Sequence, residues 1–145
     1  KVNKKIQKSN KIDKEVKLKS NPIALLDSLR INKLSKEQNL SVFWDSKVVK
    51  IEIFDSGKED GDIINLYHNG KLILENYKVK LEKKIISVTV DLSVTNEFKI
   101  FAINEGTIAP NTAKIILYDS NRTFELFTSF KKNEFAFITI IKNEF

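Results

Sequence analysis

The sequence predicts an all-β fold, an antiparallel β-sandwich of about seven or eight strands, on three observations. From residue 48 onward apolar and polar residues alternate, as at Val49, Ile51 and Ile53, and a period of two is typical of strands with one buried face. Turn signals separate these runs at intervals of roughly 8–12 residues, with no helical stretch between them. The composition, with ten Phe and abundant Ile, suits the pleated surface of a sheet.

The first 20 residues are predicted to be a basic linker or tail in front of a single sandwich domain, residues 21–145. They hold eight Lys against Asp13 and Glu15, so they carry the whole net charge of +6 and leave the rest of the chain neutral. Such a composition is typical of a solvated linker. A nucleic-acid-binding domain carries its basic patch on the fold itself, so no nucleic-acid partner is expected. No run of about 18 apolar residues is present, so no membrane span is expected.

Residues 22–31 are predicted to form a short N-terminal helix. Asn21 is a good N-cap and Pro22 suits the first helical position, while Leu26 and Leu29 follow at helical spacing. The next stretch, residues 32–46, is polar. Its expected apolar anchors are Leu34, Leu40, Val42, Phe43 and Trp44.

The strands are expected to follow in regular order to the end of the chain. Their approximate ranges are 49–53, 64–67, 71–75, 86–92, 98–102, 113–117, 124–126 and 134–142. Asn69-Gly70 predicts a two-residue hairpin, because both residues tolerate positive φ. Val88 and Phe137 are among the residues expected in the core. The last strand is almost entirely apolar, which predicts burial on both faces and a partner strand on both sides.

Few residues in the chain are suited to catalysis. There is no Cys and a single His, His68, so neither a nucleophile–base pair nor a zinc site is expected. None of the four Gly fits a phosphate-binding loop. We therefore expect no enzyme. A small hydrolase that uses paired carboxylates is kept as an alternative, because 19 acidic residues are available.

An acidic turn between two predicted strands is the candidate metal site. Asp55, Glu59, Asp60 and Asp62 crowd this turn, and hard cations such as calcium prefer several oxygen ligands at one point. The pattern of the helical EF-type loop does not fit. The competing interpretation is that Asp and Gly serve only the geometry of the turn. No cofactor is expected other than calcium at this turn.

Exposed aromatic residues are the candidate ligand-binding group. Trp44, Tyr67 and Tyr77 are predicted to offer flat rings on which a glycan stacks. Trp44 precedes the first clear strand, however, and its alternative role is to cover one end of the core.

Several separated motifs resemble a family of uncharacterised exported bacterial proteins and lipoproteins over residues 48–141. The motifs are Ile51-Glu52-Ile53-Phe54-Asp55, Asp60-Gly61-Asp62, Asn69-Gly70, Ala102-Ile103-Asn104-Glu105-Gly106 and Pro110-Asn111-Thr112-Ala113. The chain departs from the pattern at Ala109, where a second Pro is usual. The resemblance implies a β-sandwich appended to other modules and export to the periplasm, cell surface or medium, but no activity.

These observations lead to three hypotheses about function. The first is a non-enzymatic binding or structural module of an exported bacterial protein, with a glycan or a protein as its partner. The second is a calcium-stabilised surface module that uses the acidic turn. The third is the carboxylate-dependent hydrolase. The chain lacks Met altogether, even at its first position, so we expect a processed or trimmed product.

Overall fold

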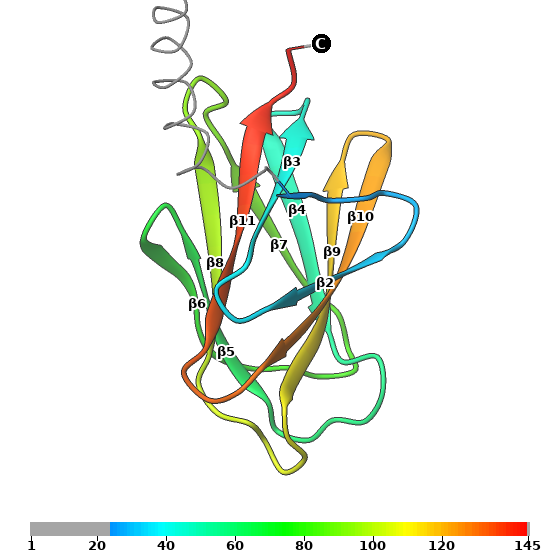
Figure 1. Ribbon diagram of the computed structural model, residues 1–145, viewed down its shortest axis with the longest axis vertical. Helices are drawn as coiled ribbons and strands as arrows, with labels where there is room; N and C mark the ends of the chain where they lie inside the picture. The colour runs from blue at the N-terminus through cyan, green and yellow to red at the C-terminus, as the bar shows by residue number, and fades with distance from the viewer. Residues whose placement is uncertain (1–23, 145) are drawn as a thin grey trace, which may run out of the picture.

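The computed structural model describes residues 24–144, which form two β-sheets packed face to face (Figure 1). These residues contain strands and no helix, so the all-β prediction is confirmed, but there are more strands than predicted. The eleven strands are β1 (Ala24–Leu25), β2 (Ile31–Ser35), β3 (Asn39–Trp44), β4 (Val48–Phe54), β5 (Ile63–His68), β6 (Lys71–Lys78), β7 (Lys84–Thr89), β8 (Asn96–Ala102), β9 (Asn111–Asp119), β10 (Arg122–Phe130) and β11 (Phe135–Lys142).

Both sheets are mixed, and the prediction of a purely antiparallel sandwich is therefore wrong. One sheet has six strands in the order β1-β3-β11-β8-β5-β6, and the other has five in the order β2-β10-β9-β4-β7. The parallel pairs are β1 with β3, β3 with β11 and β2 with β10. β2 and β3 come from the polar stretch 32–46. β2 buries only Leu34, so its alternation is a weak signal in the sequence.

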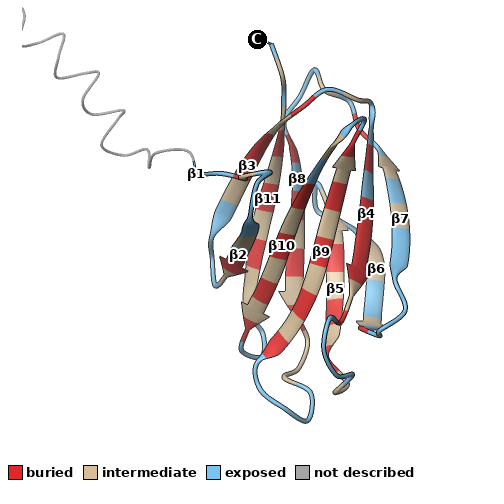
Figure 2. Ribbon diagram, turned by 90° about the vertical axis from the view of Figure 1, so that its right-hand side faces the viewer, coloured by how far each residue is buried: buried red, intermediate tan, exposed pale blue. Residues whose placement is uncertain are grey.

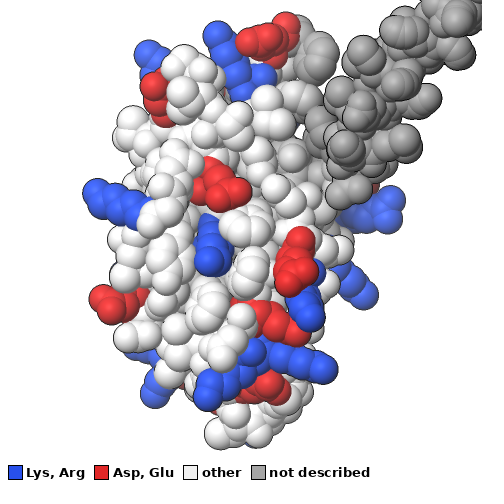
Figure 3. Space-filling model, turned by 60° about the vertical axis from the view of Figure 1, so that its left-hand side comes forward, with Lys and Arg blue, Asp and Glu red and all other residues white. Residues whose placement is uncertain are grey.

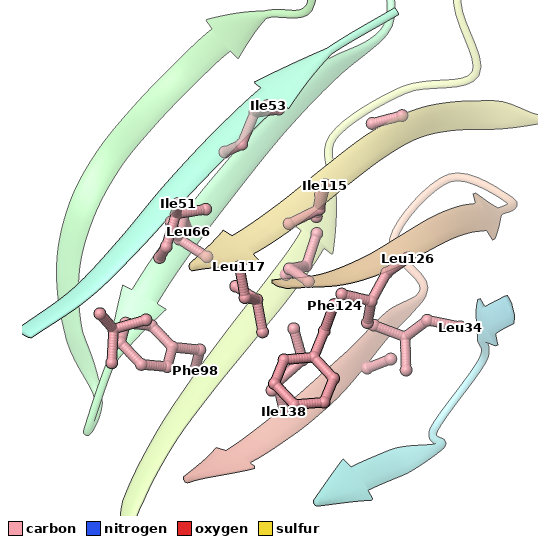
Figure 4. Packing of buried hydrophobic residues seen from close by; sticks show 14 of the residues in the cluster. Leu34, Ile51, Ile53, Leu66, Phe98, Ile115, Leu117, Phe124, Leu126 and Ile138 are labelled. Atoms are coloured by element: carbon pink, nitrogen blue, oxygen red, sulfur yellow. The ribbon is translucent and has the colours of Figure 1, made fainter. Parts of the chain in front are cut away.

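The core lies between the two sheets and consists of alternate residues of the strands (Figure 4). In β9 every second residue is buried, and most of β10 shows the same alternation, which gives the banding seen in Figure 2. The two edge strands on the other side, β6 and β7, are much more exposed. The largest fully buried side chains are Trp44, Phe98, Phe130, Leu34, Ile53, Ile64, Leu66, Ile100, Ile115, Leu117, Leu126 and Ile140.

The last strand, β11, has partners on both sides as predicted, but it is buried on one face only. It lies between β3 and β8. Ala136, Ile138 and Ile140 fill the core, whereas Phe137 is half-buried and pairs with the outward-facing Lys99. Phe137 was thus expected on the wrong face. Val88 is also only half-buried, because it belongs to the edge strand β7 and packs against the margin of the core.

The predicted helix over residues 22–31 is absent from the described part of that range. Residues 22 and 23 lie outside the described residues, and Ala24 and Leu25 form β1. A turn held by side chains follows. The Asp27 carboxylate accepts hydrogen bonds from the Leu29 N–H at 2.9 Å and from Arg30 Nε at 2.9 Å. Such local bonds from Asp compete with helix formation, which explains why helical spacing alone misled here.

The predicted basic tail, residues 1–20, lies outside the described residues. No helix in residues 24–144 is both long and apolar enough to cross a membrane. On the face shown in Figure 3, Lys and Arg side chains are interspersed with Asp and Glu. This mixture agrees with the neutral charge of the chain after residue 20.

A buried carboxylate fixes the upper end of the sandwich, where the turns after β3 and β9 meet (Figure 1). Asp119 is 0% exposed. Its Oδ2 accepts hydrogen bonds from the Asp45 N–H at 2.9 Å and from Arg122 at 2.6 Å, and its Oδ1 accepts one from the Ser46 N–H at 3.0 Å. Because β3 and β9 belong to different sheets, this carboxylate ties the two sheets together at that end.

Candidate metal centre

The loop of residues 55–62 lies at the lower end of the sandwich (Figure 1). Three Asp carboxylates of this loop come together there. This loop joins β4 of the five-stranded sheet to β5 of the six-stranded sheet. One carboxylate oxygen from each of Asp55, Asp60 and Asp62 lies within 4.8 Å of the others. Asp55 directly follows β4 and Asp62 directly precedes β5, so the cluster sits where the two sheets meet.

Backbone hydrogen bonds hold both ends of this loop against the segment that follows β6. The Asp55 N–H donates to the Lys80 carbonyl at 2.8 Å, and the Val79 N–H donates to the Asp62 carbonyl at 2.8 Å. Asp55 Oδ1 also accepts a hydrogen bond from the Gly57 N–H at 3.0 Å. The backbone therefore sets the positions of Asp55 and Asp62, and it holds their carboxylates close together although like charges repel.

Two oxygens of the cluster are buried and accept no hydrogen bond. Asp62 is 0% exposed, and its Oδ2 accepts from the Thr112 N–H at 2.9 Å. Its Oδ1 has no hydrogen-bond partner, and neither has the buried Oδ1 of Asp60. Buried polar atoms in native proteins are nearly always paired, so each exception calls for an explanation, such as an ion. These two oxygens are the strongest sign that the cluster holds a ligand.

The loop before β9 covers the cluster, and it can approach this closely because residue 106 is Gly. Gly106 adopts a φ of +68°, and a Cβ at this position would overlap Asp62 Oδ1 and lie 2.7 Å from the Asp60 carbonyl oxygen. That same carbonyl accepts hydrogen bonds from the Thr107 N–H at 2.8 Å and from Thr107 Oγ1 at 3.2 Å. The backbone around Gly106 therefore forms one wall of the site.

Two Asn side chains connect this covering loop to the start of β5. Asn104 accepts a hydrogen bond from the Ile63 N–H at 2.9 Å and donates to the Gly61 carbonyl at 3.0 Å. The fully buried Asn111 donates to the carbonyls of Ile63 and Asn104, at 3.0 and 2.9 Å. Sequence reasoning about the acidic turn missed both residues, because they lie in another part of the chain, Asn104 in the loop before β9 and Asn111 at the start of β9. Their only sequence signal is their place in the turn motifs at residues 104–106 and 110–113.

Burial raises the pKa of Asp62 from its ordinary value of 3.8 to about 7. Loss of solvation is the largest cause, because removing a carboxylate from water disfavours its charged form. The Thr112 N–H opposes the rise, while the proximity and negative charge of Asp60 and the charge of Asp55 add to it. In the absence of a cation the three carboxylates therefore cannot all be ionised without cost. A divalent cation between them would remove this cost.

In calcium-free protein, Asp62 should make stability fall as the pH rises from 5 to about 8. Because its pKa is higher in the folded state than in the unfolded chain, its contribution is fully present below pH 3.8 and is lost as the pH rises through about 7. The measurement is the melting temperature in chelator across this range, for the wild type and for Asp62→Asn. The wild-type melting temperature should fall more steeply. Carboxyls with a lowered pKa, such as Asp27 and Asp91, contribute equally to the pH dependence of stability in both proteins. Parallel curves would contradict this prediction.

Glu59, the fourth acidic residue predicted for the site, does not join the cluster. Its Oε2 accepts a hydrogen bond from the Leu81 N–H at 2.7 Å, so it fastens the loop to the segment after β6. The structure thus brings together three of the four predicted residues. It also provides a residue in the same loop, with the same charge, that can serve as a control.

The structure does not bring together the three aromatic residues predicted to bind a glycan. Trp44 is 0% exposed and its Nε1 donates to the Val48 carbonyl at 3.1 Å, so it belongs to the core. Tyr77, on β6, packs against the core from the edge of the six-stranded sheet. Tyr67 is half-buried and pairs with Lys99 on the outer face of that sheet. One of the three residues is therefore inaccessible, and the other two point to opposite faces.

Sequence reasoning missed a different aromatic group, on the outer face of the six-stranded sheet. The Lys99 ammonium lies 4.7 Å from the ring centroid of Phe135, 5.4 Å from that of Tyr67 and 5.8 Å from that of Phe101. These residues come from three adjacent strands, β11, β8 and β5. The signal in the sequence was the Phe residues at alternate positions of β11, which were expected in the core.

Comparison of the chain with models of protein families, with curated proteins and with solved structures finds no match. The chemistry of the site is therefore argued from its own residues.

Proposed function

We propose that this chain is a non-enzymatic β-sandwich module of an exported bacterial protein, in which a calcium ion bound by Asp55, Asp60 and Asp62 joins the two sheets at one end. The observation that carries the proposal is the pair of buried, unpartnered oxygens, Asp60 Oδ1 and Asp62 Oδ1, within a cluster of three carboxylates. The resemblance of residues 48–141 to exported bacterial domains supports the setting, in which modules bind calcium with dissociation constants on the order of 10⁻⁴–10⁻³ M.

The donor set favours calcium over a transition metal. All three candidate ligands are carboxylates, which suit hard cations, whereas zinc sites use His and Cys. Calcium accepts six to eight oxygens in flexible geometry. The three Asp side chains supply part of this number, and backbone carbonyls and water supply the rest in comparable sites.

The same geometry favours a cation site over the carboxylate-dependent hydrolase. In a glycosidase the two carboxyl groups flank the bond to be cleaved, about 5 Å or more apart. Here the three carboxylate oxygens lie within 4.8 Å of one another, and the Gly106 loop covers the fully buried Asp62. A general acid or base must reach its substrate, and Asp62 lacks that access, so Asp62 cannot form a catalytic pair with either of the other two carboxylates.

Calcium at about 10 mM should raise the melting temperature by roughly 5–10 °C over that in chelator. A ligand that binds only the folded state stabilises it by about 2.7 kcal/mol at a hundredfold excess over its dissociation constant. Calcium at about 10 mM gives this excess if the dissociation constant is about 10⁻⁴ M, and the stabilisation corresponds to a shift of this size for a domain of this length. Asp60→Asn and Asp62→Asn should each abolish the rise, because each removes a charged ligand.

Glu59→Gln is the matched control, since it removes one negative charge from the same loop without touching the cluster. It should retain the full rise in melting temperature. Identical wild-type melting temperatures in calcium and in chelator would refute the proposal, and so would an equal loss of the rise in Glu59→Gln, because this would reduce the effect to general charge repulsion.

A further inference from the structure

A pocket of about 300 Å³ lies directly beside the acidic cluster. Asp55 and Asp60 belong both to the cluster and to the lining of the pocket, whereas Asp62 does not line it. The lining also includes Ile108, Pro110 and Phe127. A cation held by the three carboxylates would thus be closed off on the side of Asp62 and would border the pocket on the side of Asp55 and Asp60.

A bound calcium ion would still require oxygens from outside the three side chains. It takes six to eight ligands, and two of the three Asp residues already use one oxygen to accept backbone hydrogen bonds, from Gly57 and from Thr112. Further oxygens can approach through the pocket, because it adjoins Asp55 and Asp60. Two adjacent hydroxyl groups on one molecule supply two such oxygens at once, with less loss of entropy than two separate waters.

The charges around the pocket favour a neutral ligand. The three carboxylates and a divalent cation together leave one negative charge, and Lys58 in the lining of the pocket offsets it. No net positive charge remains to hold an anion. The lining also has an apolar part: Ile108 is 56% exposed, and Phe127 is half-buried on the outer face of β10. An aromatic ring with an aliphatic neighbour suits the apolar face of a sugar ring.

We propose that the calcium site together with this pocket binds a neutral sugar, with two vicinal hydroxyl groups on the calcium ion and one face of the pyranose ring against Phe127. This inference rests on the proposed function, because the ion is the principal contact. It also assigns the glycan to a place other than the predicted aromatic residues Trp44, Tyr67 and Tyr77.

The test is isothermal titration of the full chain with methyl mannoside, methyl galactoside and methyl glucoside, in millimolar calcium and in chelator, after titration with calcium alone. At least one sugar should bind in calcium, and its binding should be lost in chelator. Phe127→Ala should weaken sugar binding at least tenfold and leave calcium binding unchanged. Phe137→Ala is the matched control, because it removes a half-buried strand Phe outside the pocket lining, and it should bind sugar like the wild type.

The outcomes separate the two proposals. Calcium binding without binding of any of the three sugars would overturn this inference and leave the proposed function intact. Failure to bind calcium would overturn both. Equal sugar binding in chelator would show that the ion is not the contact. This result would refute the mode of recognition proposed here.

Discussion

Asp119→Ala is expected to lower the free energy of unfolding by about 2–4 kcal/mol, because it leaves two backbone N–H groups without their acceptor and removes a charged hydrogen bond to Arg122. The Asp119 carboxylate is 0% exposed and accepts hydrogen bonds from two backbone N–H groups and from Arg122. Without it, the N–H groups of Asp45 and Ser46 lose their acceptor, and the Arg122 guanidinium loses its closest counter-charge. The measurement is urea denaturation at pH 7, with the midpoint and slope fitted for both proteins.

Asp91→Ala is the matched control for this effect. Asp91 also uses its carboxylate to accept hydrogen bonds within a turn, from the N–H and the hydroxyl of Ser93, but it is exposed. Its replacement should cost about 0.5–2 kcal/mol, in the range for loss of an exposed cap. Equal losses in the two variants would mean that burial and the ion pair with Arg122 contribute nothing measurable.

Gly106→Ala should lower the free energy of unfolding by roughly 2–5 kcal/mol and greatly weaken calcium binding. The added Cβ would overlap Asp62 Oδ1 and lie 2.7 Å from the Asp60 carbonyl, in a backbone conformation at φ +68° that is unfavourable for Ala. The strain and the steric overlap each cost about 1–3 kcal/mol. Urea denaturation in chelator measures the first effect, and calorimetric titration with calcium measures the second.

Gly70→Ala is the control that separates backbone strain from steric overlap. Gly70 has a φ of +83°, but a Cβ there would meet nothing within 4 Å. This variant should show the backbone strain alone, about 1 kcal/mol, and should bind calcium like the wild type. If Gly106→Ala behaved like Gly70→Ala in both measurements, the close contact between the Gly106 loop and the acidic cluster would have no role in the site.

The sequence predicts the parts of this fold in which local pattern and tertiary structure agree. Alternation correctly located β4, β8 and β9, and Asn69-Gly70 forms the predicted turn between β5 and β6, with φ values of 48° and 83°. β2 and β3 escaped prediction because their partners are remote. Ile31 pairs with Glu125, and Asn39 pairs with Phe137. A pairing across so much of the chain leaves no local signal, and neither do parallel ladders, which lack a hairpin turn.

The candidate site was also predictable only where its residues are close together in the sequence. Asp55, Asp60 and Asp62 were predictable because one turn carries them all, whereas Glu59 differs only in its hydrogen bond to the remote Leu81 N–H. Asn104 and Gly106 lie in the loop before β9, and Asn111 begins β9, so their part in the site depends on the packing of the two sheets. Trp44 was predicted either to offer an exposed ring or to cover one end of the core, and the structure places it in the core. The polar stretch before the first clear strand is itself β3, and the packing of this strand buries the ring.

The interior position of β11 has a consequence for how this protein can fold. β11 supplies the partner for both β3 and β8, so without it the six-stranded sheet separates into two fragments with open edges. β3 therefore remains unpaired on that side until β11 has been synthesised. Topologies dominated by such distant pairings fold slowly, and until they are complete they expose unpaired strand edges that favour aggregation. Biogenesis of this protein should consequently depend more than most on protection of the incomplete chain.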